Sequence, residues 1–283
     1  MNAELSLYPA IEQLLLATDI DTKPPAVQAL SARWQQGGLR RDGTAPLYRL
    51  PQPGRPLRPT LVPAAEVPRR RLGSPEGHAA MVHAIAHIEF NAINLALDAA
   101  WRFRELPDSY VDDWLRIAAE EASHFQLLRA RLQALGYDYG DFPAHNSLWE
   151  MALQTDHDVL VRMALVPRVM EARGLDAMPI VQDKLRRIGD LETAAVLDTL
   201  LRDEIGHVRA GNYWFSTLCD ARGLEPLATF RALLGDYRAG ELRGVFNLEA
   251  RLDAGFSAFE LAMMQDFTVT RERREKNTDA SAV

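Results

Sequence analysis

The sequence contains very little cysteine and no excess of positive charge. Cys219 is the single cysteine among 283 residues, which excludes an intramolecular disulfide and any zinc ribbon or four-cysteine iron site formed by this chain alone. The formal net charge of −7 gives no overall attraction to nucleic acid or to an anionic membrane surface. We therefore expect a cytoplasmic protein that works without a membrane and for which tRNA is a disfavoured partner.

Long apolar runs and strand patterns are also missing. No stretch approaches the roughly 20 apolar residues that cross a bilayer, and residues 1–20 lack a basic leader followed by a long apolar core. The region expected to form the core shows helical periodicity without strand alternation. Because 47% of the residues are hydrophobic, the chain can bury one sizeable core. These features predict a soluble all-α protein.

Proline is concentrated in the first part of the chain, where it excludes long helices and central strands. We expect this part to form a strap that combines extended chain with short helices near residues 11–17 and 26–34. The predicted domain organisation is, in chain order, a helical and extended strap at 1–73, a four-helix bundle at 74–223, packing helices at 224–269 and a polar tail at 270–283.

The bundle helices are placed by their end signals. Ser74 and Pro75 have the chemistry of an N-cap and a first helical residue. Pro167 lies inside the third helix and should kink it. C-terminal caps are expected at glycines: Gly136, Gly174 and Gly223. The expected helices span 75–103, 108–135, a less regular segment from 147 to 174, then 178–188, 191–221, 225–240 and 247–267.

Two of the long helices carry the same short motif, Glu-x-x-His. It occurs as Glu121 with His124 and again as Glu204 with His207. A spacing of three residues puts both side chains on one helix face, where they can bind one ion. Chance supplies such pairs readily in a chain of this composition, so the motif alone is weak evidence.

The surroundings of the two motifs repeat as well. Glu89 precedes Glu121 by 32 residues, and Glu171 precedes Glu204 by 33. A glutamate on one helix followed by Glu-x-x-His on the next, twice over, is the ligand pattern of dinuclear carboxylate proteins built on four helices. The predicted metal ligands are Glu89, Glu121, His124, Glu171, Glu204 and His207. Oxygen-rich ligation with one nitrogen per ion favours two iron ions, with manganese or a mixed Mn/Fe pair as alternatives, over structural zinc.

Four further side chains lie close to these ligands in the sequence or on the same helix face. An acid precedes each Glu-x-x-His, and Glu120 and Asp203 could hold the histidine of the opposite motif through its second ring nitrogen. Trp114 and Trp214 lie seven residues from Glu121 and His207. They could line a substrate channel or pass electrons, although core packing is the commoner role of such aromatics.

The motifs EEASHF, PRVMEARGLDAMP and RDEIGHV, with the stretch from Arg69 to Phe103, resemble the uncharacterised ferritin-like family DUF455. The resemblance extends over almost the whole chain, including the proline-rich strap. It implies a ferritin-like fold with a dinuclear metal centre, and it implies no particular substrate. The ligand pattern is also similar, more distantly, to MiaE-type tRNA hydroxylases and to rubrerythrins, whose usual four-cysteine iron domain this chain cannot form.

These observations favour an oxidoreductase that uses O2 or peroxide to oxidise or hydroxylate a small substrate, with electrons from an external donor. An iron oxidase or storage protein is a second interpretation. A third is a non-catalytic bundle whose ions stabilise the helices while an outer surface binds a partner. The substrate, the electron donor and the oligomeric state, including a homodimer, stay open.

Overall fold

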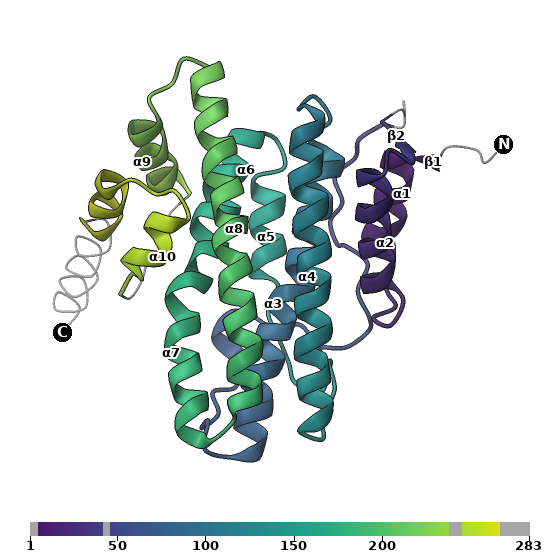
Figure 1. Cartoon of the computed structure of the whole chain (residues 1–283), viewed down its shortest axis with the longest axis vertical. Coiled ribbons are helices and arrows are strands. Elements are labelled where there is room, and N and C mark those ends of the chain that lie inside the picture. Colours follow the sequence, from purple (N-terminus) through teal and green to yellow (C-terminus); the bar gives the residue numbers. More distant parts are fainter. Residues whose placement is uncertain (1–4, 42–45, 238–244, 267–283) are drawn as a thin grey trace. The chain divides into compact units, whose positions relative to one another are not determined.

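The computed structural model describes residues 5–41, 46–237 and 245–266, and most of these residues are helical (Figure 1). The described strands are a two-residue parallel pair, β1 (Leu5–Ser6) with β2 (Leu39–Arg40). The prediction of an all-α fold is therefore confirmed. The chain divides into two compact units, the first formed by residues 1–159 and 185–196 and the second by 160–184 and 197–283.

The first unit is built on two long helices, α3 (Pro75–Arg102) and α4 (Asp108–Ala134), which pack along one another (Figure 1). Helix α1 (Leu7–Leu16) lies on α3, and α2 (Lys23–Gln35) lies on α4. A short helix, α5 (Ser147–Gln154), also contacts α3. Helix α3 thus contacts helices from several parts of this unit.

Helix α3 begins as its sequence predicts. The Ser74 hydroxyl accepts a hydrogen bond from the Gly77 amide at 3.0 Å, and Pro75 occupies the first turn. Among the described residues, α3 is the one helix long and apolar enough to span a membrane, contrary to our expectation that no stretch would be. However, 72% of its most apolar window is buried within the protein, which is the pattern of a core helix.

Helix α4 ends in a Schellman motif. Gly136 has a φ of +83°, which favours glycine because it has no Cβ. The Gly136 amide donates to the Gln133 carbonyl at 3.0 Å, and the Tyr137 amide donates to the Leu132 carbonyl at 3.0 Å. The expected glycine cap at this position is confirmed.

The N-terminal segment has the expected mixture of short helices and irregular chain. Helices α1 and α2 both start a few residues before the predicted positions. In α2 the prolines at 24 and 25 lie in the first turn, where a missing N–H breaks no helical bond. Residues 46–63 are non-helical, followed by a 3-10 turn, η1 (Ala64–Glu66). Hydrogen bonds of 2.9 and 3.0 Å join Val62 and Thr60 to Ala144.

The second unit contains the irregular third segment and most of the last long helix. Here α6 (Val159–Leu165) passes into a π-helical segment, η2 (Val166–Glu171), and then into α7 (Ala172–Ile188). The distortion predicted at Pro167 is thus a widened helical turn, as expected where a proline removes a helical hydrogen bond. A cap at Gly174 was wrong: its backbone is not left-handed, and α7 continues through it and through Pro179.

Helix α8 (Leu191–Ala221) has the predicted bounds and ends at Gly223, whose φ is +65°. Gly211 on α8 faces Pro167, because a Cβ at position 211 would lie 2.4 Å from the Pro167 Cβ. Beyond α8 lie α9 (Pro226–Asp236), α10 (Leu248–Asp253) and helical residues 258–266. The helix expected over 247–267 is interrupted at Gly255, which has a φ of +93°. The expected helical residues 238–240 and the tail at 270–283 lie outside the described residues.

Candidate metal centre

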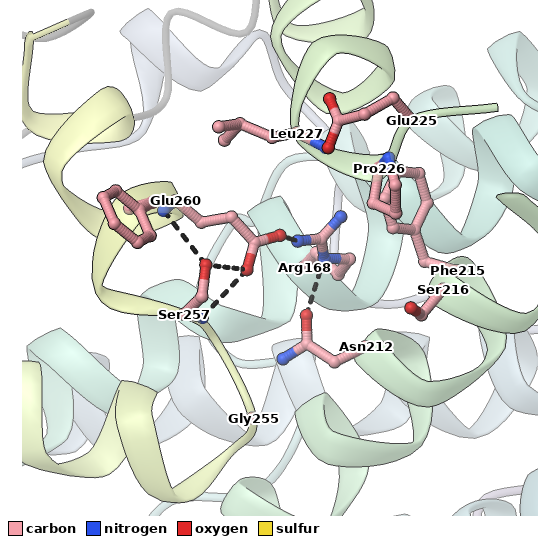
Figure 2. Close-up of a pocket in the computed structure, with 11 residues that line it drawn as sticks. Arg168, Asn212, Phe215, Ser216, Glu225, Pro226, Leu227, Gly255, Ser257 and Glu260 are labelled. Atoms are coloured by element: carbon pink, nitrogen blue, oxygen red, sulfur yellow. Dashed lines mark hydrogen bonds and ion pairs between the residues drawn. The ribbon is translucent and has the colours of Figure 1, made fainter. Parts of the chain in front are cut away.

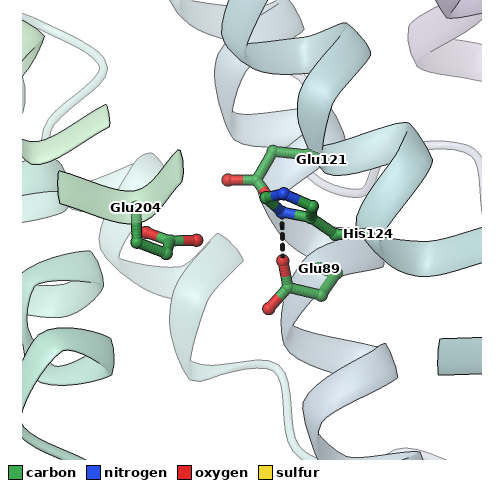
Figure 3. Close-up of side chains that lie close together, drawn as sticks. All are labelled: Glu89, Glu121, His124 and Glu204. Atoms are coloured by element: carbon green, nitrogen blue, oxygen red, sulfur yellow. Dashed lines mark hydrogen bonds and ion pairs between the residues drawn. The ribbon is translucent and has the colours of Figure 1, made fainter. Parts of the chain in front are cut away.

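Three of the predicted ligands meet inside the first unit. Glu89 comes from α3, whereas Glu121 and His124 lie one turn apart on α4, and each side chain is at most 1% exposed. The His124 Nδ1 lies 3.2 Å from Glu89 Oε2 and 3.2 Å from Glu121 Oε2 (Figure 3). One ligand atom from each residue lies within 4.8 Å of the others. The close packing of α3 and α4 therefore brings two carboxylates and an imidazole together.

The charge of this cluster depends on the histidine. Burial alone would lower the pKa of His124, but the hydrogen bonds and attraction of Glu121 and Glu89 outweigh burial and raise its pKa to about 11. Without a cation, the imidazole therefore carries a proton between two carboxylates. Two carboxylates in one buried cluster favour a cation beside them, because burying negative charge is costly.

The donor set suits a divalent cation. Metal bonds of about 2.0–2.2 Å place neighbouring ligand atoms about 3 Å apart, which is close to the two 3.2 Å distances at His124. A cation would take the place of the proton on Nδ1, because that nitrogen faces both carboxylates. Two carboxylates and one imidazole thus suit a metal ion once His124 Nδ1 has lost its proton.

The second unit holds the other Glu-x-x-His motif on α8. His207 is fully buried, and its Nδ1 lies 3.7 Å from Glu204 Oε1. Glu204 is buried as well, with 5% exposed. Glu171, the last residue of η2, is only partly buried. The assignment of Glu171, Glu204 and His207 as metal ligands stays a prediction. So does a single dinuclear centre formed by all six residues.

The two acids that precede the motifs have neighbours of their own. Glu120 forms an ion pair of 2.9 Å with Arg116 one turn earlier on α4, and about one third of its side chain is exposed. Asp203 lies 3.4 Å from Arg202 and is similarly exposed. The predicted support of each opposite histidine by these carboxylates stays a prediction.

Both predicted aromatic residues are buried. Trp114 lies in the first unit, with its ring centroid 5.9 Å from that of Tyr110. Trp214 lies in the second unit beside Tyr213, at 5.1 Å between ring centroids. Their surroundings are those of packed core residues, and a role in a channel or in electron transfer stays a prediction.

Two histidines near Glu89 belong to a separate network. The His87 ring lies 2.9 Å from the Tyr139 hydroxyl through Nδ1 and 3.0 Å from the His145 carbonyl through Nε2. His83 Nε2 accepts a hydrogen bond from the Gly140 amide at 2.9 Å. Burial lowers the pKa of both imidazoles to about 4, so they are neutral near pH 7.

Several cationic side chains are buried, which the sequence patterns did not predict, and Lys23 and Arg168 are two of them. Lys23 on α2 is 1% exposed, and its ammonium donates to the carbonyls of Ala17 and Gly54 and, at 2.7 Å, to Asn94 Oδ1 on α3. Arg168, three residues before Glu171, is buried in the second unit. No local pattern marks either residue, because burial of a single charge depends on the tertiary packing around it.

The comparisons with known proteins agree with the resemblance seen in the motifs. A family model described as "Protein of unknown function (DUF455)" matches residues 16–262. The chain is 53% identical over 213 residues to an uncharacterized protein of Haemophilus influenzae, an alignment that covers 73% of this chain and 74% of that protein. No solved structure matches the chain.

Proposed function

Because the chain belongs to the DUF455 family, whose function is unknown, we propose its function from the site itself: a dinuclear iron or manganese centre that serves an O2- or peroxide-dependent oxidoreductase. The observation that carries the proposal is the contact of His124 with Glu89 and Glu121, all three buried. Two carboxylates and one imidazole are a donor set that suits a divalent cation.

The second metal ion is proposed from the repeat. Glu171, Glu204 and His207 reproduce the spacing of Glu89, Glu121 and His124 to within one residue, and Glu204 and His207 are both buried. Two such half-sites supply four carboxylates and two imidazoles, which balance two divalent cations. Oxygen-rich ligands of this kind favour iron or manganese.

The chemistry would be divided between metal and protein. The metal ions would supply the redox step, in which O2 or peroxide is reduced and a small substrate is oxidised or hydroxylated. The protein would hold the ions through the two half-sites, and binding of a metal ion would release the proton from His124 Nδ1. Electrons would come from an external donor, since the single cysteine forms no iron–sulfur centre. We propose that the protein works in the cytoplasm.

Metal content and oxygen use test the proposal. Protein purified from iron-replete and manganese-replete cells should hold about two equivalents of iron, manganese or both by mass spectrometry of the metals. Ferrous iron added to metal-free protein in air should cause oxygen consumption at about two irons per chain. Glu121→Gln should lose most of the metal and the oxygen consumption. Glu76→Gln is the matched control, because this glutamate lies on the exposed first turn of α3.

The outcomes separate the alternatives. Zinc as the preferred metal with no oxygen consumption would favour a metal-stabilised binding module. Uptake of many irons per chain would favour an iron oxidase or storage protein. Equal metal content in wild type and Glu121→Gln would refute the site. Binding to tRNA that falls steeply with salt would reopen the nucleic-acid interpretation, and analytical ultracentrifugation would show whether the chain forms a homodimer.

A further inference from the structure

The second unit contains a cavity of about 270 Å³ that uses none of the six predicted metal ligands (Figure 2). It lies among η2, α8, the start of α9 and the segment around residues 255–260. Its volume is slightly below that of typical pockets for drug-sized ligands, which suits a molecule of about ten non-hydrogen atoms. The side chains that matter below are Arg168, Asn212, Phe215, Glu225, Phe259 and Glu260.

The guanidinium of Arg168 lies at the wall of this cavity with one donor unused. Its Nε donates to Asn212 Oδ1 at 2.6 Å, and its Nη2 donates to Glu260 Oε1. Its Nη1 is buried and makes no hydrogen bond. Burial lowers the pKa of Arg168 to about 10, and Glu260 offsets part of that effect, so the side chain stays charged at neutral pH.

The guanidinium is held firmly in place. Its central carbon lies 4.1 Å from the ring centroid of Phe215 and 3.9 Å from that of Phe230. Figure 2 shows Nη1 on the side turned away from Asn212 and Glu260, toward Pro226 and Leu227. A buried N–H without an acceptor costs about 1–3 kcal/mol, so this donor favours a ligand that supplies one.

The charges around Arg168 define what kind of acceptor suits it. Glu260 already neutralises the guanidinium, and its second oxygen accepts from the Ser257 amide and hydroxyl at 2.8 Å. The Glu225 carboxylate also lines the cavity and caps α9 by accepting from the Leu227 and Ala228 amides. A carboxylate ligand would bring a third negative charge near one cation. A neutral carbonyl oxygen satisfies Nη1 without that repulsion.

Apart from Ser216 and Gly255, the other lining residues are apolar. Phe215, Pro226 and Leu227 line the cavity, and so does Phe259, which is 79% exposed to solvent. An exposed phenylalanine gains stability when a flat apolar group covers it. A ligand that fits this cavity therefore combines a carbonyl oxygen, which accepts from Arg168, with a flat apolar group that covers Phe259.

We propose that this cavity binds a small uncharged molecule in which an amide or similar carbonyl is attached to a flat apolar ring. The carbonyl oxygen accepts from Arg168 Nη1, and the ring packs on Phe259. The proposal stands independently of the metal centre, since binding requires neither ion nor metal ligand.

The test uses benzamide as the probe on the full-length chain, with NMR line shapes and chemical shifts as the readout. Benzamide should bind with a Kd on the order of 1 mM, as expected of a ligand of this size. Benzoate, benzylamine and toluene keep the ring but change the polar group, and each should bind at least fivefold more weakly. Equal binding of all four probes, or no benzamide binding up to tens of millimolar, would overturn the proposal.

Two variants locate the binding. Phe259→Ala removes an exposed ring and should weaken benzamide binding at least fivefold without unfolding the chain. Leu252→Ala on α10 is the control, since this side chain is also half exposed but does not line the cavity. Arg168→Lys keeps the positive charge opposite Glu260 but loses the planar guanidinium and its Nη1 donor. This variant should abolish the preference for benzamide over toluene. Unchanged affinity in Phe259→Ala would contradict the assignment, whatever the folding of the arginine variant.

Discussion

The two units bury charge in different ways. In the first unit, Glu89 and Glu121 both contact His124, so two buried carboxylates share one imidazole. In the second unit, Arg168 is neutralised by Glu260 and packed between aromatic rings, and it has one donor left over. Two buried carboxylates beside an imidazole favour a cation, whereas a neutral pair with an unused N–H favours a neutral acceptor. Similar burial therefore points to different ligands.

The largest expected effect concerns the metal. At a free metal concentration of about 1,000 times Kd, a single bound ion stabilises the folded state by about 4 kcal/mol. Ferrous or manganous ions under anaerobic conditions should raise the free energy of unfolding of the wild type by about this amount, measured with urea. Glu121→Gln should lose most of the gain, and Glu76→Gln should keep it. A gain of equal size in both variants would show that the ions bind elsewhere.

The next prediction breaks the charge pair of the second unit. Arg168→Met leaves Glu260 without its buried cation and should lower the free energy of unfolding by about 3 kcal/mol. Arg168→Met combined with Glu260→Gln removes both charges and should recover more than half of that loss, because methionine packs well among the aromatic rings. Urea unfolding of the two variants measures the difference. A double variant as unstable as the single one would mean that packing, and not charge, dominates this site.

Lys23 is another buried cation, and its hydrogen bonds go to neutral acceptors: two carbonyls and Asn94. Burial lowers its pKa from 10.5 to about 7. Between these values the unfolded chain holds a proton that the folded chain releases, so stability rises with pH by up to about 1.4 kcal/mol per unit. From pH 7.5 to 9.0 this amounts to about 2 kcal/mol.

The comparison of two lysine variants isolates this effect. Lys23→Met should lose the extra rise in stability, whereas Lys184→Met, on an exposed position of α7, should keep it. Urea unfolding at several pH values gives the slopes. Parallel slopes for wild type and Lys23→Met would show that the ammonium stays protonated in the fold.

How far the sequence predicts this molecule depends on the range of the signal. Helix α8 was predicted with its observed bounds, and α3 to within a residue, because caps such as Ser74 and Gly223 act on neighbouring backbone groups. The meeting of Glu89 with Glu121 and His124 follows from helical phase plus the repeat. The cap predicted at Gly174 was wrong because a glycine caps a helix in this way only where its own backbone is left-handed. The burial of Lys23 and Arg168 is set by distant segments, so no local pattern announces it.

The smallest expected effect concerns Glu120. Its variants distinguish a carboxylate that only forms a surface ion pair from one that also supports the metal centre. Its pair with Arg116 is about one third exposed at both ends, so Glu120→Gln should change the free energy of unfolding of metal-free protein by less than about 1 kcal/mol. If Glu120 also orients a metal-binding histidine as the sequence predicts, the same variant should weaken metal binding about tenfold or more.

The matched variant is Arg116→Met, which breaks the same ion pair and keeps the carboxylate. Metal titrations of both variants, followed by urea unfolding without metal, distinguish the two roles. Weaker metal binding in Glu120→Gln alone would assign the carboxylate to the metal centre. Equal metal affinity in wild type and both variants would leave Glu120 as a surface partner of Arg116 and confine the metal chemistry to fully buried side chains.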